Sequence, residues 1–154
     1  MNRYVIALVA AAFAGPTLAQ AAGDAAAGEK GFKKCKSCHM IVADDGTVIV
    51  KGGKTGPNLY GVAGRQAGTA EGYKYGKSTV QAGEAGLVWD EEQFVAYLPD
   101  PKKFLRTYLD DSSAKSKMSF RLKKGGEDIY AYLVSVGPEV AADEPADEES
   151  TESN

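Results

Sequence analysis

The sequence predicts an all-α fold in which short helices are joined by long loops. Four segments carry helical signals, and the stretches between them are rich in glycine, which is typical of loops. With 154 residues, 44% of them hydrophobic and 25% charged, the chain suits one soluble domain and is too short for a large multidomain catalyst. Because a core built from such short helices would be thin, we expect something other than side chains to fill its centre.

The first helix is predicted from Asp24 to about Cys38. Asp24 can cap its N-terminus. Small or apolar residues then recur on one face at spacings of three and four, namely Ala25, Gly28, Phe32 and Cys35. A small hairpin at most is expected around residues 47–50. Residues 51–86 are expected to form mostly loops with short helical turns, because this stretch is rich in glycine.

Three further helices are predicted in the second half of the chain, over residues 90–98, 100–109 and 127–136. Asp90 can cap the first of them. In the second, Asp100 precedes Pro101, and proline is favoured at the first position of a helix. The third presents an apolar face and ends at Gly137-Pro138, which cannot continue a helix.

The two ends of the chain differ from the middle. Residues 1–19 have the basic, apolar and small-residue order of a secretory signal peptide, with an uncleaved amphipathic anchor as the alternative. Residues 139–154 hold seven acidic and no basic side chains, so we expect a disordered acidic tail. The domain between them, residues 20–138, carries a net charge of +3. We expect an exported periplasmic protein without stable membrane insertion.

The chemistry is indicated by Cys35-Lys36-Ser37-Cys38-His39, a C-x-x-C-H sequence that is the attachment signature of c-type haem. Two thiols one helical turn apart can each add to a haem vinyl group. The histidine directly after the second thiol can then bind the iron as an axial ligand. These residues are the only cysteines and the only histidine of the chain.

Three other interpretations of this motif stay open. A thioredoxin-like redox pair is expected in a βαβ context, which the sequence does not indicate. A zinc site needs at least one further cysteine or histidine, and the chain has none. A chance match is the third.

The second axial ligand is approached by elimination among three methionines. Met1 leaves with the signal peptide, and Met40 directly follows His39, so it cannot reach the opposite face of the haem. Met118 remains, about 80 residues downstream, far enough for the chain to wrap around the haem. An open iron or a lysine ligand is the alternative.

Two protein ligands leave no open coordination position, which disfavours activation of oxygen or peroxide. A thioether ligand and burial of the haem both raise the reduction potential. The sequence therefore predicts a one-electron carrier and not an enzyme. A haem enzyme or gas sensor with a displaceable sixth ligand, and a haem-free thiol oxidoreductase, are the competing functions.

Several motifs together extend this prediction to the whole domain. They are Gly-Phe-Lys-Lys-Cys-Lys-Ser-Cys-His (31–39), Lys-Thr-Gly-Pro-Asn-Leu-Tyr-Gly (54–61), Gly-Tyr-Lys-Tyr-Gly (72–76), Trp-Asp-Glu-Glu (89–92), Asp-Pro-Lys-Lys (100–103) and Ser-Lys-Met-Ser-Phe (116–120). With them the chain resembles the class I c-type cytochromes, most closely the bacterial cytochrome c2 group and the Paracoccus-type cytochromes c-550. The resemblance implies the fold of that class around one covalently attached haem c.

The resemblance also implies roles for residues around the haem. The carbonyl of Pro57 is expected to accept a hydrogen bond from the second ring nitrogen of His39. Hydrogen bonds to the buried haem propionates are expected from Arg65, Tyr75 and Trp89.

Further positions follow from the same resemblance. Tyr97 matches a hydroxyl near the methionine sulfur, and Phe120 matches an aromatic ring that covers the haem edge. Gly28 and Phe32 match the place where the first helix crosses the last, near Tyr132. For the aromatic residues, simple core packing is the alternative.

Basic residues cluster in the segments that bear the two iron ligands. If they surround the exposed haem edge, they steer the protein onto acidic faces of redox enzymes. The docking residues we expect are Lys34, Lys36, Lys102, Lys103, Lys117 and Lys123, with a plain solvated surface as the alternative.

The expected partners are a cytochrome bc1-type complex as donor and cytochrome c oxidase or other periplasmic redox proteins as acceptors. A photosynthetic reaction centre is the alternative acceptor. We expect a monomer that does not bind nucleic acid. The acidic tail is expected to solubilise the chain or to compete with partners for the basic face.

Overall fold

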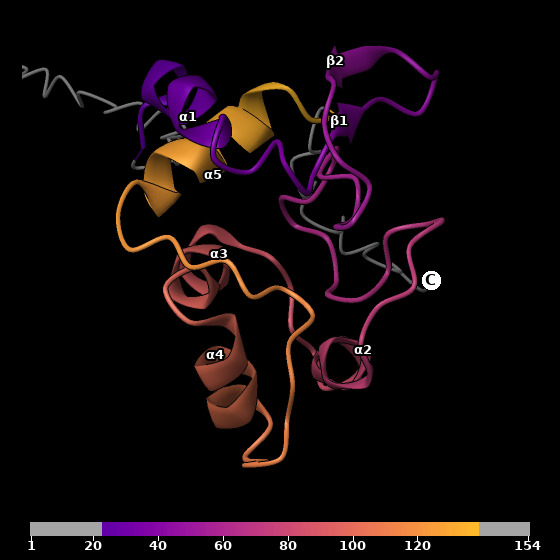
Figure 1. Ribbon diagram of the computed structural model, residues 1–154, viewed down its shortest axis with the longest axis vertical. Helices are drawn as coiled ribbons and strands as arrows, with labels where there is room; N and C mark the ends of the chain where they lie inside the picture. The colour runs from indigo at the N-terminus through magenta and orange to yellow at the C-terminus, as the bar shows by residue number, and fades with distance from the viewer. Residues whose placement is uncertain (1–22, 139–154) are drawn as a thin grey trace, which may run out of the picture.

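The computed structural model describes residues 23–138 (Figure 1). The predicted signal peptide and the predicted acidic tail lie outside the described residues. The described elements are α1 (Ala25–Phe32), β1 (Ile41–Val42), β2 (Val48–Val50), α2 (Lys77–Glu84), α3 (Glu91–Tyr97), α4 (Pro101–Tyr108) and α5 (Gly126–Ser135). The predicted class of short helices and long loops is confirmed, with one two-stranded sheet in addition.

The first and last helices, α1 and α5, pack across one another (Figure 1). They meet at Gly28, where an added Cβ would lie 1.9 Å from the carbonyl oxygen of Asp128 and 2.8 Å from the Cβ of Tyr132. One turn further along α1, the rings of Phe32 and Tyr132 lie 5.8 Å apart. The Asp24 carboxylate caps α1 by accepting from the Ala26 amide at 2.8 Å. This crossing brings the two ends of the domain together.

The first helix is shorter than predicted, because α1 ends at Phe32 and not near Cys38. From there the backbone closes tighter turns, in which the Cys35 amide bonds the Phe32 carbonyl at 2.8 Å and the Cys38 amide bonds the Cys35 carbonyl at 3.0 Å. These three-residue turns differ from the four-residue spacing of an α-helix. The regular helix therefore ends at Phe32, and the two cysteines lie in the turns that follow it.

The helices α3 and α4 begin where their caps predict. The carboxylate of Asp90 accepts from the Gln93 amide at 2.7 Å, and that of Asp100 accepts from the Lys103 amide at 3.0 Å. The last helix, α5, also lies within one residue of its predicted bounds. Local capping signals thus place α3 and α4 correctly, whereas α5 begins without a side-chain cap.

The helix α2 lies inside the stretch that was predicted to form mostly loops. It begins after Gly76 without a side-chain cap and buries mainly small residues. At Gly83 an added Cβ would lie 1.9 Å from the carbonyl oxygen of Ala67, so backbone and helix are in direct contact. A helix that packs through glycine, alanine, serine and threonine gives little apolar periodicity, which explains why its pattern was missed.

The two strands form the small hairpin expected near residues 47–50. They pair antiparallel, with Ile41 opposite Val50 and Val42 opposite Val48, and an irregularity lies between the two pairs. The side chain of Asn58 braces this hairpin, because its amide oxygen accepts from the Val42 amide at 3.0 Å and its nitrogen donates to the Val42 carbonyl at 2.7 Å. Within residues 23–138, every helix is too short or too polar to cross a bilayer.

Candidate functional site

A cavity of about 330 Å³ lies inside the ring of helices and loops. All ten residues that were predicted to hold or surround a haem line this one cavity: Cys35, Cys38, His39, Pro57, Arg65, Tyr75, Trp89, Tyr97, Met118 and Phe120. They come from segments spread across most of the domain. The space that short helices alone could not fill is therefore bordered by the residues that the motifs singled out.

The two cysteines lie on the wall of this cavity as free thiols. Burial raises the pKa of the Cys35 thiol to about 11, with a further contribution from nearby Cys38 and a partial offset from Lys34. The pKa of Cys38 is lowered by hydrogen bonds from the side chains of Thr55 and Ser37. The turn after α1 places both sulfurs toward the same cavity, as attachment to one ligand requires.

The imidazole of His39 is held in one tautomer. Its Nδ1 lies 2.9 Å from the carbonyl oxygen of Pro57, and because a carbonyl only accepts, Nδ1 carries the proton. Burial lowers the pKa of His39, which the bond to Pro57 partly offsets. The ring is therefore neutral near pH 7, with the lone pair of Nε2 available to a metal ion.

Gly56 also belongs to this site, although the sequence predicted no role for it. An added Cβ at Gly56 would lie 2.4 Å from Cε1 of His39, so only glycine lets the backbone approach the ring this closely. The signal in the sequence is its place before Pro57, whose carbonyl fixes the same ring. Gly56 and Pro57 together set the orientation of the imidazole.

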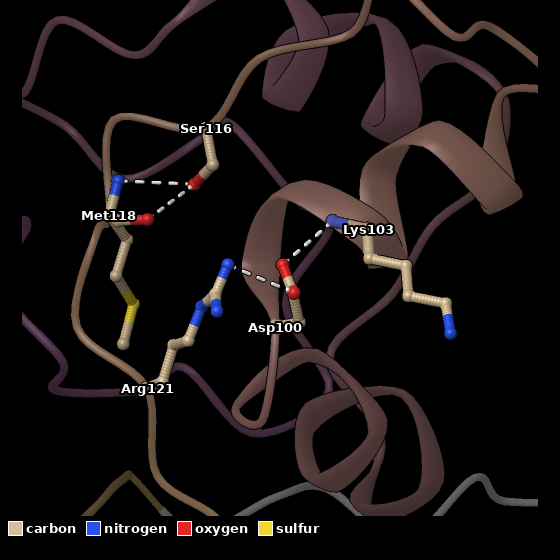
Figure 2. A network of polar contacts seen from close by, with 5 residues as sticks. All are labelled: Asp100, Lys103, Ser116, Met118 and Arg121. Carbon is tan, nitrogen blue, oxygen red and sulfur yellow. Dashed lines mark hydrogen bonds and ion pairs between the residues drawn. The ribbon is translucent and has the colours of Figure 1, made fainter.

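Met118 lies on a loop that is fixed by Ser116 (Figure 2). The Ser116 hydroxyl accepts from the Met118 amide nitrogen at 3.1 Å and contacts the Met118 carbonyl oxygen at 3.0 Å. In Figure 2 the thioether of Met118 extends away from Ser116, and it belongs to the lining of the cavity. Ser116 lies two residues before Met118 in the sequence, but no local pattern predicts that it holds the Met118 loop.

Tyr97 lines the same cavity as Met118, and its hydroxyl contacts Ser116. Its hydroxyl lies 3.2 Å from the Ser116 hydroxyl, and burial raises the pKa of Tyr97. Its ring packs edge-on against Trp89, with ring centres 4.9 Å apart. Tyr97 therefore acts on the Met118 loop through Ser116 while it also contributes to the aromatic wall of the cavity.

Arg65 lies on the lining with its guanidinium directed to backbone carbonyls. It donates to Tyr60 at 2.9 Å and to Asn58 at 3.3 Å. Burial lowers the pKa of Arg65, and its charge partly offsets the rise that burial gives the pKa of Tyr75. A half-buried guanidinium beside a half-buried phenol forms a site that suits an acidic group of a ligand.

The mouth of the cavity is marked by Phe120, Lys34 and Lys117. Phe120 is 41% exposed although it also lines the cavity, so this edge of the site faces solvent. Lys117 donates to the Lys74 carbonyl, and its ammonium lies 5.7 Å from the centre of the Tyr73 ring.

The six lysines predicted to dock partners are all exposed. Only Lys34 and Lys117 line the cavity. Lys36 lines a different groove, and Lys102, Lys103 and Lys123 line neither.

These residues fit a covalently attached haem. The site supplies two thiols, a neutral imidazole with a free nitrogen and a thioether around one cavity, which is the donor set of a c-type haem with His and Met ligands. Within the described residues, no group of three or more His, Cys, Asp or Glu side chains could hold a metal ion. The zinc alternative therefore finds no site in this part of the chain.

Comparisons with known proteins agree on one group, although no family model matches the chain. Cytochrome c-551 of Roseobacter denitrificans is 62% identical over 137 residues, which cover 88% of this chain and 96% of the relative. Cytochrome c-550 of Paracoccus denitrificans is 49% identical over 138 residues, which cover 88% of each chain. The solved structure of cytochrome c2 from Rhodobacter capsulatus superposes with a TM-score of 0.72 at 60% identity, covering 74% of this chain and 98% of that structure.

Proposed function

This chain belongs to the cytochrome c2 and c-550 group of class I c-type cytochromes, and from that membership we propose that it is a soluble periplasmic carrier of single electrons. It is an electron-transfer cytochrome with one covalently attached haem c. When bound, the haem supplies an iron that alternates between the ferrous and ferric states. The observation that carries the proposal is the convergence of Cys35, Cys38, His39 and Met118 on one cavity.

The two cysteines and the two proposed iron ligands have different roles. We assign the covalent attachment to Cys35 and Cys38, whose thiols add to the haem vinyl groups. His39 would hold the iron through Nε2, because its Nδ1 is occupied by the Pro57 carbonyl. Met118 would supply the second protein ligand, and a neutral thioether would favour the ferrous state and raise the reduction potential.

A site with both axial positions taken by protein side chains favours electron transfer over catalysis. The hydrogen bonds between Ser116 and the Met118 backbone hold the Met118 loop in place. A fixed loop keeps external ligands from the iron, and it also limits structural change between oxidation states. Both properties serve a carrier and hinder an enzyme or a gas sensor.

Electrons pass through the solvent-facing edge of the site in this proposal. Phe120 lies at that edge, and Lys34 and Lys117 flank the cavity with positive charge. Positive charge around an exposed edge accelerates encounter with acidic partner surfaces and makes it dependent on salt. We therefore propose a bc1-type complex as donor and a terminal oxidase or other periplasmic redox protein as acceptor.

Replacement of Met118 tests the closed coordination. The reduced haem-loaded protein should not bind carbon monoxide, and Met118→Ala should bind it, as absorption spectra of both proteins would report. Binding of carbon monoxide by the unmodified protein would instead support the gas-sensor alternative. A colourless mature protein would contradict haem attachment altogether.

The docking surface is tested by electron-transfer rates at several ionic strengths. Lys34→Glu should lower the rate constant with bc1 complex and with oxidase several-fold at low salt, and the loss should shrink at high salt. Lys77→Glu is the matched control, because Lys77 is exposed at the start of α2 and does not line the cavity. Equal losses in both variants would contradict a localised docking surface.

Periplasmic location is checked by cell fractionation and by N-terminal sequencing of the mature chain.

A further inference from the structure

A second groove, distinct from the haem cavity, lies between α1, β2 and α5. Its volume is about 420 Å³, and none of its lining residues lines the haem cavity. Its apolar part is formed by the buried rings of Phe32 and Tyr132 together with Ile49 and Val50 of β2. Ile49 is 38% exposed, so this apolar part is open to solvent.

The remaining lining of this groove is strongly basic. Lys30, Lys33, Lys36 and Lys51 surround it, against Glu29 as the one acidic residue of the lining. All four lysines are exposed. Within residues 23–138, none of these four lysines forms an ion pair with a carboxylate. The groove therefore presents an apolar floor with uncompensated positive charge around it.

We propose that the acidic segment 139–154 of this same chain docks in this groove. The segment carries seven carboxylates and no basic residue, which complements the four lysines. It begins with Glu139 followed by Val140-Ala141-Ala142, a short apolar stretch that suits the floor. The placement goes beyond electron transfer and does not depend on it.

The segment starts close enough to reach the groove. Tyr132 lines the groove, and the described chain ends six residues later at Pro138, whose ring lies beside Gly61. The segment starts one residue further on, at Glu139. At no more than about 3.6 Å per residue, seven residues cannot separate its start from Tyr132 by more than about 25 Å. The sixteen residues of the segment can extend more than twice that distance, so its carboxylates can contact all four lysines.

The covalent connection makes such a weak contact effective. An exposed pair of one lysine and one carboxylate contributes little by itself. A tethered segment is present at an effective concentration in the millimolar range, so several such pairs suffice for substantial occupancy without tight binding. The contact should therefore be sensitive to salt. It would also cover Lys36, one of the lysines that the sequence predicts to dock partners.

Carbodiimide cross-linking of the haem-loaded full-length mature protein tests this placement, since it joins a lysine amine directly to a carboxylate that touches it. Peptide mapping should find segment 139–154 joined to Lys33 and Lys36 within one molecule. The double variant Lys30→Glu/Lys51→Glu should lower these particular cross-links several-fold, although Lys33 and Lys36 remain available. Lys77→Glu is the control and should leave them unchanged, because α2 contributes no residue to the groove.

The dependence of these cross-links on ionic strength is a second test of the proposed docking. The cross-links should fade as the Debye length drops from about 30 Å at 0.01 M to about 3 Å at 1 M ionic strength. Three results would each overturn the proposal: cross-links mainly to Lys102, Lys103 or Lys123, cross-links mainly between isotopically distinguished molecules, or no cross-links from the segment. A colourless or misfolded preparation would be visible in the absorption spectrum, so failure of the proposed function is distinguished from failure of docking.

Discussion

The hydroxyl of Ser116 bonds both backbone polar groups of Met118, accepting from its amide nitrogen at 3.1 Å and donating to its carbonyl oxygen at 3.0 Å. A serine hydroxyl has one proton, so the contact of 3.2 Å between Tyr97 and Ser116 must be donated by Tyr97. The three residues thus form a directed chain of hydrogen bonds from the aromatic wall of the cavity to the backbone of Met118, the proposed iron ligand.

Ser116→Ala should loosen the Met118 loop and leave the Tyr97 hydroxyl without this partner. Burying an unpaired hydroxyl costs about 1 to 3 kcal/mol, so we expect the free energy of unfolding to fall within that range. Imidazole, which must displace Met118 from the ferric iron, should bind several-fold more tightly. Chemical denaturation and imidazole titration measure the two effects.

The matched control is Ser113→Ala, which removes an exposed hydroxyl that bonds the carboxylate of Asp111 in a surface turn. It should leave imidazole affinity unchanged. If Ser116→Ala also left it unchanged, Ser116 would be stabilising the fold without positioning the ligand.

Gly28→Ala should separate α1 from α5. The new Cβ would overlap the Asp128 carbonyl, which is backbone and cannot move aside as a flexible side chain could. Overpacking of this kind costs about 1 to 3 kcal/mol or more, and we expect a loss at the upper end, measured by thermal or chemical unfolding. Gly31→Ala in the same helix is the control, because its Cβ would meet only the Ile129 side chain at 3.3 Å. It should cost clearly less than Gly28→Ala, because only a side chain has to shift and the better helix propensity of alanine offsets part of that cost.

The elements that the sequence predicts well are those whose signals are local. Asp90 and Asp100 accept hydrogen bonds from amides three residues further on, so the sequence around each cap contains the whole interaction. The haem motif is equally local, because five consecutive residues contain both thiols and the proposed first ligand. Met118 could be proposed as the second ligand only by elimination, which was possible because the chain has three methionines.

The features that were missed depend on contacts between distant segments. The helix α2 is stabilised by close approach of Gly83 to Ala67, which leaves no periodic apolar pattern. Gly56 is required by a ring seventeen residues earlier, and Tyr97 reaches Ser116 across nineteen residues. The early end of α1 also depends on distant segments. The turns after it direct Cys35 and Cys38 to a cavity whose other walls come from later parts of the chain.

Asp100 joins two parts of the fold, and its two roles can be separated (Figure 2). One carboxylate oxygen caps α4 through the Lys103 amide at 3.0 Å, and the other pairs with Arg121 at 3.0 Å. Loss of the cap in Asp100→Ala should cost about 1 kcal/mol. The side chain of Arg121 is 57% exposed, so Arg121→Gln should cost less than about 1 kcal/mol.

Asp100→Asn distinguishes these contributions, because asparagine keeps the capping oxygen and removes the charge. Its free energy of unfolding should resemble that of Arg121→Gln and exceed that of Asp100→Ala. Equal destabilisation by asparagine and alanine at position 100 would assign the effect to the ion pair and contradict the capping role.

Stability at alkaline pH should depend on Tyr130. Its hydroxyl donates to the Trp89 carbonyl at 3.3 Å, and burial, followed by the charges of Asp90 and Glu91, raises the pKa of Tyr130. The folded protein therefore keeps this proton at a pH where the unfolded chain has lost it. Its contribution to stability is complete below pH about 10, the ordinary tyrosine value, and is lost as pH rises through the folded pKa.

Tyr130→Phe removes this one contribution while the buried ring remains. Near neutral pH the variant should lose about 1 kcal/mol or less, for one long hydrogen bond. Above pH about 10 its free energy of unfolding should fall less steeply with pH than that of the unmodified protein, by up to about 1.4 kcal/mol per pH unit. A residual slope is expected, because burial also raises the pKa of Tyr75, Tyr97 and Tyr132. Guanidinium unfolding of the reduced proteins across this range measures both slopes, and parallel curves would show that Tyr130 ionises alike in the folded and unfolded states.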